Sequence, residues 1–456
     1  MGIRRILAVW TAKLVKKACQ IAGKQGVTLA GKIALKIDPT ILKGLSMQVR
    51  EKIIVTCGTN GKTTTNNLLC SAIMAEHNTM SKNNIVVCNR TGSNMLNGVV
   101  SAFVLAAGLN GKLNADYACI EVDEASTVRI FPHFKPDFMI LTNLFRDQLD
   151  RYGEIDTTMN LLREAMVMAP EMKVIVNGDD SLSAYLAMSS NNEYRTFGIS
   201  EQYFDQEDSN EIREGQFCKQ CGEKLHYHFY HYSQLGHYTC EHCGFKRPLL
   251  DFDVKNIVSG GKLDFDVENL GEITHISAKY RGFYNIYNIV AAHAAGKSAG
   301  LHLNNYNKVL ADYNPENGRN ETFSINGTEI VLNLAKNPAG FNQNILAVME
   351  DKRPKDVIVL INDNSQDGID VSWLWDVDFD RFKDINAASI TVSGIRANDM
   401  RLRLKYVDIP AILEQNIEKA IREKIKTGVK NLYVLVNYTA LYSTHNILKK
   451  MEVEGK

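Results

Sequence analysis

The stretch Val55-Thr-Cys-Gly-Thr-Asn-Gly-Lys-Thr-Thr-Thr65 decides the fold of this chain. An apolar run, "KIIVTC", precedes it and a helix-compatible segment through "NNLLCSAIMA" follows it, which predicts a strand, a loop and a helix. Glycines let the backbone N–H groups of such a loop surround a phosphate, and a lysine adds positive charge. The stretch therefore predicts a nucleotide-binding P-loop.

Seven consecutive residues are assigned to phosphate binding: Gly58, Thr59, Asn60, Gly61, Lys62, Thr63 and Thr64. Lys62 is also expected to act on the transferred phosphate, and the Thr63 hydroxyl is expected to bind Mg²⁺. The usual spacing places a glycine five residues before Gly61, where this chain has Thr56. A structural strand-to-helix turn seldom carries Gly-Lys-Thr in this order, so nucleotide binding is the favoured interpretation.

The segments around the P-loop alternate between apolar strands and helical patterns from Lys52 to about Phe197, which predicts an α/β fold with a parallel, helix-covered sheet. A polar insertion at about 201–250 interrupts the pattern, and a turn-rich passage at 312–320 marks a domain boundary. We predict an N-terminal helical segment (1–50), a central ATP-binding domain (51–315) and a smaller C-terminal α/β domain (316–456).

The composition excludes several classes of function. Acidic and basic residues balance at 52 each over 456 residues, which argues against nucleic-acid binding. No run of about twenty apolar residues or signal-peptide pattern is found, and scattered cysteines suit a reducing compartment, so a cytoplasmic protein is expected.

Residues 3–20 form a basic amphipathic helical pattern. Ile6, Leu7, Trp10 and Leu14 share one face, and five basic residues occupy much of the remainder: Arg4, Arg5, Lys13, Lys16 and Lys17. We expect this helix to pack on its own domain, with peripheral contact to the inner face of the membrane as the alternative.

The strand in "YACIEVDEAS" ends in acidic residues, Glu121, Asp123 and Glu124. The carboxyl ends of parallel strands in one sheet bind ligands at a common edge, so a carboxylate here can reach a metal beside the P-loop. A magnesium site is therefore favoured over a merely solvated acid.

The polar insertion carries two matched Cys-x-x-Cys pairs, Cys218/Cys221 and Cys240/Cys243, separated by eighteen residues. This spacing predicts a zinc ribbon with four thiolate ligands, in preference to a redox dithiol or four idle cysteines. A closed site of this kind stabilises structure and performs no catalysis.

The order of the motifs resembles that of the Mur ligases. The motifs are "GTNGKTTT", the acidic strand end, "LTNLFRDQLDRYG" (141–153), "VNGDD" (176–180), "GFYNIYNIVAA" (282–292) and "GRNE" (318–321). The resemblance implies that ATP phosphorylates a substrate carboxylate and that an amine displaces the phosphate. It also implies that Asn288 contacts adenine, that Arg319 stabilises phosphate charge, and that Gln148 replaces a metal-binding histidine.

Two departures from the Mur pattern concern catalysis and the amine. The segment after "LDRYG" lacks the lysine that is carbamylated in Mur ligases, and "LNLAKNPAGFNQ" (332–343) replaces the "DYAHNP" phrase of amino-acid-adding relatives. The C-terminal domain therefore implies a different amine donor.

The C-terminal motifs, including "DGIDVSWLWDVDF" (367–379), resemble those of the MurT family, the ligase subunits of lipid II isoglutaminyl synthase. The resemblance implies a GatD-like glutaminase partner in a heterodimer, and an aspartate here that completes the partner's catalytic triad. Asp370 is the first choice and Asp367 the second.

The implied reaction amidates the D-isoglutamate α-carboxylate of the lipid II stem peptide, through an acyl phosphate, with ammonia from glutamine. Two other interpretations are an amino-acid-adding Mur or folylpolyglutamate ligase and a non-enzymatic, ATP- and zinc-dependent nucleic-acid-binding switch.

Overall fold

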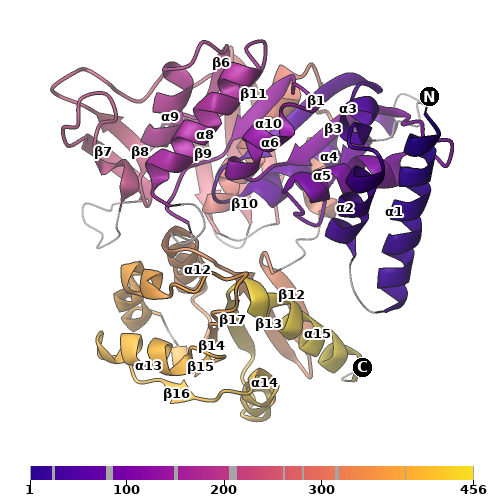
Figure 1. Ribbon diagram of the computed structural model, residues 1–456. Helices are drawn as coiled ribbons and strands as arrows, with labels where there is room; N and C mark the ends of the chain where they lie inside the picture. The colour runs from indigo at the N-terminus through magenta and orange to yellow at the C-terminus, as the bar shows by residue number, and fades with distance from the viewer. Residues whose placement is uncertain are drawn as a thin grey trace.

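The computed structural model describes residues 2–22, 26–78, 86–147, 153–204, 213–259, 262–279, 282–313, 318–385 and 387–454. Figure 1 shows a larger body, built from the first two thirds of the chain, above a smaller C-terminal body. None of the described helices is long and apolar enough to cross a membrane.

The larger body is organised around a nine-stranded sheet in the order β11-β10-β9-β6-β5-β4-β1-β3-β2. Its strands are β1 (Val49–Cys57), β2 (Val86–Cys88), β3 (Ala115–Glu121), β4 (Phe138–Leu141), β5 (Lys173–Asn177), β6 (Tyr194–Ile199), β9 (Phe252–Ser259), β10 (Leu263–Asn269) and β11 (Glu272–Ala278).

The strands from β2 to β9 pair in parallel, whereas β10 pairs antiparallel with both β9 and β11. The predicted parallel sheet is confirmed, and the structure adds β2, β9 and β10, which the sequence pattern did not predict. β10 alternates buried and half-buried residues, a different pattern from the continuously buried strand β3 on which the prediction of a parallel sheet depended.

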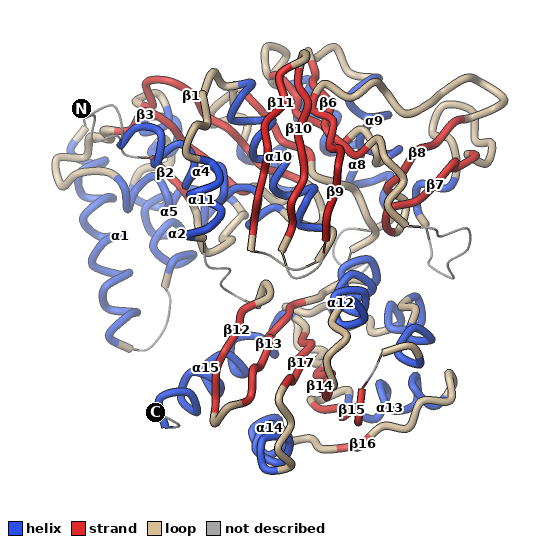
Figure 2. Tube along the Cα trace, turned by 180° about the vertical axis from the view of Figure 1, so that it is seen from behind, coloured by secondary structure: helices blue, strands red, loops and turns tan. Residues whose placement is uncertain are grey.

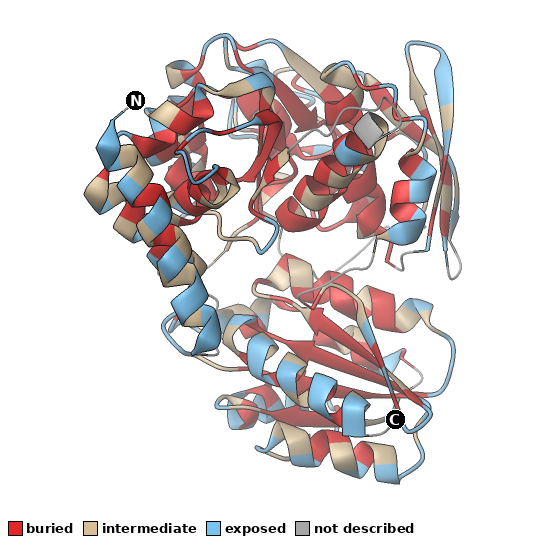
Figure 3. Cartoon of the chain, turned by 90° about the vertical axis from the view of Figure 1, so that its right-hand side faces the viewer, coloured by how far each residue is buried: buried red, intermediate tan, exposed pale blue. Residues whose placement is uncertain are grey.

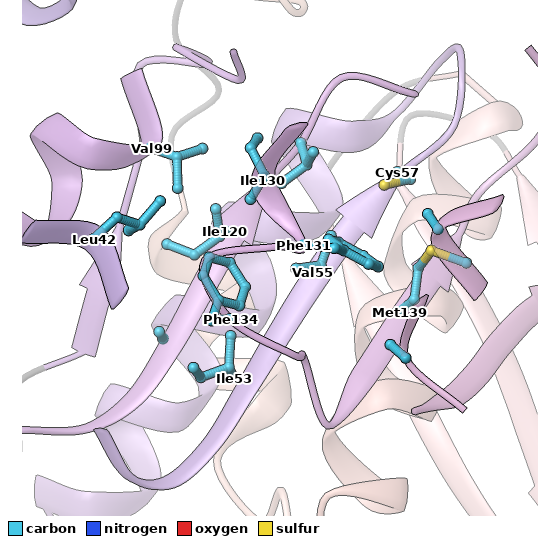
Figure 4. Close-up of a cluster of buried hydrophobic side chains, with 14 of the residues drawn as sticks. Leu42, Ile53, Val55, Cys57, Val99, Ile120, Ile130, Phe131, Phe134 and Met139 are labelled. Atoms are coloured by element: carbon cyan, nitrogen blue, oxygen red, sulfur yellow. The ribbon is translucent and has the colours of Figure 1, made fainter. Parts of the chain in front are cut away.

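Helices cover both faces of this sheet, as Figures 1 and 2 show. They are α1 (Ile3–Ile21), α2 (Val27–Ile37), α3 (Ile41–Ser46), α4 (Lys62–Asn78), α5 (Leu96–Ala106), α6 (Thr127–Ile130), α8 (Ile155–Met168), α9 (Ser181–Met188), α10 (Tyr284–Ser298) and α11 (Tyr306–Asp312). Figure 4 shows one part of the core, where Val55 of β1, Ile120 of β3 and Met139 of β4 meet Phe131 and Phe134.

The N-terminal helix α1 packs on its own domain, as expected, against α2 and α5. The apolar face described above is not the face that makes this contact. Ala8, Val9 and Ala12 are fully buried, whereas Leu7, Trp10 and Leu14 are exposed and Ile6 is half-buried. Small residues allow α1 to approach its neighbours closely, and no such requirement is visible in a hydrophobicity pattern.

A two-stranded ribbon of β7 (His226–Tyr232) and β8 (Leu235–Thr239) occupies the predicted insertion. The C-terminal body has a six-stranded sheet in the order β12-β13-β17-β14-β15-β16. These strands are β12 (Glu321–Ile325), β13 (Thr328–Leu334), β14 (Lys355–Leu360), β15 (Ala387–Ser393), β16 (Ile412–Leu413) and β17 (Asn431–Val436).

Four helices accompany the C-terminal sheet: α12 (Pro338–Glu350), α13 (Ala397–Lys405), α14 (Ile417–Lys426) and α15 (Tyr438–Glu454). Figure 3 shows buried strands between helices whose outer surfaces are exposed. The sheet is parallel except at β12, so this is the second, smaller α/β domain that the sequence predicts. The exact domain boundaries stay predictions, and residues 314–317 of the turn-rich passage lie outside the described residues.

Candidate active site and its two accessory elements

The phosphate-binding loop connects β1 to α4 with two glycines in the left-handed region, Gly58 at φ 118° and Gly61 at φ 84°. A Cβ at Gly58 would lie 2.2 Å from Thr142 Oγ1, and one at Gly61 would lie 2.0 Å from Asn288 Oδ1. Both positions therefore require glycine, for backbone conformation and for space. The loop leads into the first turn of α4, where Lys62, Thr63 and Thr64 are buried.

A carboxylate already satisfies the anion-binding groups of this loop. The Gly58 N–H donates to Glu124 Oε1 at 2.7 Å, and Lys62 Nζ donates to the same oxygen at 2.9 Å. These are donors of the kind that a P-loop presents to a phosphate. Glu124, expected as a magnesium ligand, is therefore placed against the phosphate-binding donors.

Lys62 and Glu124 each favour the charged form of the other. Burial disfavours the charged form of Lys62, but the carboxylates of Glu124, Asp123 and Glu121 outweigh this effect and raise its pKa. Burial likewise opposes ionisation of Glu124, and the Lys62 ammonium overcomes it and lowers the Glu124 pKa. Lys62 is therefore a fixed cation at the loop.

The oxygens that fit a magnesium ion belong to Thr63 and Glu121. Thr63 Oγ1 donates to Glu121 Oε2 at 2.6 Å, and Asn94 Nδ2 donates to Glu121 Oε1 at 2.9 Å. Hydroxyl and carboxylate oxygens are the ligands that Mg²⁺ prefers, so the chemistry of this pair is compatible with the ion, and the magnesium assignment stays a prediction. Gln148, the other expected ligand, lies outside the described residues.

Arg319 reaches this pair from the start of the C-terminal domain. Its Nη2 donates to Thr63 Oγ1 at 3.0 Å, although the two residues are 256 positions apart. The guanidinium is a second cation beside the P-loop, and its contact with phosphate stays a prediction. Asn288 lies beside the P-loop: it packs against Gly61, and its backbone carbonyl accepts a hydrogen bond from Thr65 Oγ1 at 3.4 Å. Its contact with adenine stays a prediction.

The sequence analysis missed the contribution of Asn143. Its Oδ1 accepts from the Asn60 N–H at 2.9 Å, its backbone carbonyl accepts from the Thr59 N–H at 2.8 Å, and its Nδ2 donates to Asn60 O. The polar cluster after β4 indicated a ligand edge, but it did not indicate that one of its amides holds the P-loop in shape.

A cleft between the two domains runs beside the P-loop. Its lining includes Arg146 and Asp147 from the central domain and Lys336, Asp370 and Trp373 from the C-terminal domain. Ion pairs cross it, since Arg146 Nη2 lies 2.6 Å from Asp376 Oδ2 and Lys336 pairs with Asp147.

The cleft is linked directly to the P-loop by Asn337, which also lines it. Asn337 and Asn60 exchange hydrogen bonds through their side-chain amides, at 3.1 and 3.4 Å. The segment "LNLAKNPAGFNQ", which replaces the "DYAHNP" phrase, thus connects the P-loop with the cleft that Asp370 lines.

The two candidate aspartates for the partner's triad lie in different environments. Asp367 is buried, and it accepts hydrogen bonds from the backbone N–H and the hydroxyl of Thr439 at the start of α15. Asp370 is exposed, and its Oδ1 accepts from the Ser372 N–H at 2.8 Å.

Their titration also differs. The backbone N–H of Ser372 lowers the pKa of Asp370, whereas burial raises the pKa of Asp367. Asp370 is therefore an accessible, ionised carboxylate, and Asp367 ties its loop to α15.

The four cysteines of the insertion come together. Their Sγ atoms all lie within 4.8 Å of one another, and the Cys218–Cys243 and Cys221–Cys240 pairs are each 3.5 Å apart. The backbone N–H of Cys243, with that of His242, lowers the pKa of Cys240 to about 7. A compact group of four sulfurs with a favoured thiolate fits a tetrahedral metal ion with sulfur ligands.

The ribbon is anchored to the central domain through the "VNGDD" segment. Arg247 Nη1 lies 3.0 Å from Asp179 Oδ1, the Gly236 N–H donates to Asp179 O, and Gln234 Nε2 donates to Asp180 Oδ1. Asp179 and Asp180 are fully buried, and burial raises the pKa of Asp179 to about 6. The ribbon therefore supplies hydrogen-bond and ion-pair partners to the buried aspartates that follow β5.

Comparison with known proteins accounts for both halves of this architecture. Residues 55–244 match the model of the Mur ligase middle domain, and residues 334–441 match that of the MurT ligase C-terminal domain. The MurT subunit of "Lipid II isoglutaminyl synthase (glutamine-hydrolyzing)" from Staphylococcus aureus strain COL is 35% identical over 444 residues, covering 96% of each chain. This chain belongs to the MurT family.

A second MurT subunit, from Streptococcus pneumoniae strain R6, is 34% identical over 95% of this chain and 94% of its own. Solved Mur-type structures share the fold at lower identity. A pseudomurein peptide ligase type C from Methanothermus fervidus has a TM-score of 0.67 at 20% identity, over 88% of this chain and 79% of that one. MurF ligase from Thermotoga maritima in complex with ADP has a TM-score of 0.63 at 14% identity, over 94% and 84%. The MurT fold described here is thus a Mur ligase fold.

Proposed function

We propose that this chain is the synthetase subunit of a glutamine-hydrolysing lipid II isoglutaminyl synthase, an ATP-dependent carbon–nitrogen ligase of peptidoglycan biosynthesis. The observation that carries the proposal is the 35% identity to MurT subunits across 96% of the chain. The P-loop with Lys62, Thr63 and Glu121 supports the use of ATP, and the altered C-terminal domain supports an amine other than an amino acid.

The reaction proceeds in two transfers. The α-carboxylate of D-isoglutamate in the lipid II stem peptide attacks the γ-phosphorus of ATP, which gives an acyl phosphate and releases ADP. Ammonia then forms the C–N bond and expels phosphate, leaving D-isoglutamine. The ammonia comes from hydrolysis of glutamine to glutamate in the partner subunit.

The residues around the P-loop stabilise the charge of the transferred phosphoryl group. Lys62 and Arg319 supply fixed cations, Gly58 supplies a backbone N–H group, and Asn288, assigned to adenine, borders the loop at Gly61. Thr63 and Glu121 would hold Mg²⁺, with Glu124 or Gln148 as further ligands. When bound, the metal would neutralise charge on the β- and γ-phosphate oxygens.

The C-terminal domain is the proposed docking site for a GatD-like glutaminase. It exposes the large apolar side chains Ile369, Trp375, Ile395, Leu402, Tyr406, Tyr438 and Tyr442, and the rings of Trp375 and Tyr406 contact each other. Asp370 lies next to Ile369, is exposed, and stays ionised, as an aspartate that orients a histidine in a triad must. We therefore assign Asp370 to the partner's triad in preference to Asp367.

The four cysteines are assigned to one structural Zn²⁺. The proposed reaction consumes ATP and glutamine, so we place the enzyme in the cytoplasm, where both are supplied.

The test is a pair of substitutions, Asp370→Asn and Asp367→Asn, in the complex with the glutaminase. Asp370→Asn should lower glutamine hydrolysis by roughly three to four orders of magnitude, as loss of the triad aspartate does elsewhere. Amidation with free ammonium should persist, because the acyl phosphate forms at the P-loop.

Asp367→Asn is the control and should mainly lower stability, since Asp367 holds the Thr439 N–H and hydroxyl. Normal glutamine hydrolysis by both variants would exclude the triad assignment. ATP turnover that requires an amino acid, with no response to glutamine or ammonium, would instead support an amino-acid-adding ligase.

A further inference from the structure

The helix α1 carries an exposed apolar stripe on the side turned away from the protein. Its members are spaced by four, three, four and seven residues, which places them on one line along the helix. They are Ile3 (76% exposed), Leu7 (50%), Trp10 (50%), Leu14 (67%) and Ile21 (82%).

The buried face of α1, formed by Ala8, Val9 and Ala12, lies on the opposite side of the helix. Figures 1 and 2 both show α1 at the outer edge of the larger body, alongside α2. Leu109 extends the apolar stripe from a neighbouring loop: it is exposed, and its carbonyl accepts a 2.7 Å hydrogen bond from Trp10 Nε1. This bond fixes the indole at the surface.

The charge around the stripe has one sign. Residues 1–37 contain eight lysines and arginines and no aspartate or glutamate, although acids and bases balance over the whole chain. Lys17 is exposed beside the stripe, and Lys32 and Lys36 are exposed on the adjoining α2. An apolar stripe with a tryptophan and flanking cations is the pattern of a helix that lies in the interface of an anionic membrane.

We propose that the α1 stripe is a membrane-contacting surface. It binds the enzyme to the anionic phospholipids of the membrane that contains its lipid-linked substrate. The stripe enters the acyl boundary, and the basic side chains contact phosphate headgroups. The choice of a membrane as the binding partner of the stripe rests in part on the proposed function, because a lipid-linked substrate lies in a bilayer. The charge pattern and the outward stripe are independent of that function.

The experiment measures binding of the full chain, in complex with its glutaminase, to vesicles that contain no substrate. Vesicles of equal parts phosphatidylglycerol and phosphatidylcholine are compared with phosphatidylcholine alone in a flotation assay. The complex should float with the anionic vesicles, and Leu7→Gln combined with Leu14→Gln should weaken binding by roughly tenfold or more. Val167→Gln, an exposed apolar position on α8, is the matched control and should leave binding unchanged.

Two further readouts separate insertion from simple charge attraction. Bromine-labelled lipids should quench the fluorescence of the complex, and Trp10→Phe should remove most of that quenching. Arg4→Gln combined with Lys17→Gln should lower the preference for anionic vesicles and the sensitivity of binding to salt.

Three results would overturn the proposal. One is an absence of flotation with anionic vesicles. The second is a dimer of this chain that the Leu7/Leu14 variant abolishes, which would assign the stripe to a second copy. The third is loss of the glutaminase from that variant, which would assign the stripe to the partner. Amidation of substrate in detergent micelles is assayed separately, so failure of membrane binding is distinguishable from failure of the proposed function.

Discussion

Lys62 and Glu124 form the central charge pair of the site, and the pair has a consequence for ATP binding. Glu124 Oε1 accepts from both the Gly58 N–H and Lys62 Nζ, which are donors that a nucleotide phosphate needs. ATP must therefore exchange one anion for another at these donors. The exchange avoids burying an unpaired lysine in the free enzyme, which would cost more than an exposed charge.

The buried His293 gives a prediction for stability against pH. It lies in α10 between Phe252 and Tyr306, and neither ring nitrogen has a hydrogen-bond partner among the described residues. Burial, with a contribution from Lys297, lowers its pKa to about 4. The unfolded chain, with a histidine pKa near 6.5, then binds a proton that the folded protein does not, so stability is lost as pH falls from about 6.5 towards 4.

Between pH 7 and pH 4.5 the free energy of unfolding should fall by up to about 3 kcal/mol less in His293→Leu than in the wild-type protein. Urea denaturation at the two pH values measures this difference through the unfolding midpoints. His231, also buried with its pKa lowered to about 4, will keep part of the acid sensitivity in the variant. His302→Leu, at an exposed position, is the control and should leave the pH dependence unchanged. An unaltered difference between the two midpoints in His293→Leu would contradict the assignment.

The ribbon of β7 and β8 is an element that cannot be stable alone. Its own core is small, and it includes two of the cysteines together with Leu225, Tyr238 and Phe245. Contacts with Asp179 and Asp180 hold it to the central domain, and Tyr238 Oη donates to Gly178 O at 3.1 Å. Metal binding and docking therefore stabilise the same element.

Replacing Cys218 and Cys221 with serine should release about one equivalent of Zn²⁺ per chain and lower the Tm by several degrees. Elemental analysis and a thermal melt measure the two effects on the same sample. Cys19→Ser, a cysteine of α1, should retain the metal. A wild-type protein that contains no zinc would refute the assignment.

At the scale of the whole molecule, the two domains meet through polar contacts around the P-loop. Asn337 is buried, begins α12 by accepting from the Gly340 N–H at 2.8 Å, and pairs with Asn60 across the interface. Arg319 adds the contact to Thr63. Because these contacts involve the P-loop, we expect nucleotide binding and domain arrangement to be coupled in this fold.

Asn337→Ala should lower stability by about 1 kcal/mol through loss of the helix cap, and should weaken ATP binding roughly twofold to tenfold through loss of the Asn60 contact. Asn416→Ala provides the matched control, because Asn416 caps α14 with a 3.0 Å bond from the Lys419 N–H and has no contact with the P-loop. Denaturation and calorimetric titration with ATP compare the two variants. Equal ATP affinity in both would exclude the coupling.

The sequence by itself determined those features whose constraints lie within a few neighbouring residues. The Gly-Lys-Thr order fixes a phosphate loop, and the paired Cys-x-x-Cys motifs fix four thiols that can converge. The buried strand β3 was predictable because its centre, residues 117–120, is a continuous apolar run.

Only the tertiary structure decided which of several equivalent residues takes each role. Asp367 and Asp370 look alike in sequence, and burial against Thr439 of α15 distinguishes them. Glu121 ends β3 and Glu124 follows it, yet Glu121 contacts Thr63 and Glu124 contacts Lys62. The α1 helix turned its alanines inward because close packing depends on the shape of the neighbouring helices, a property that no local pattern of hydrophobicity contains.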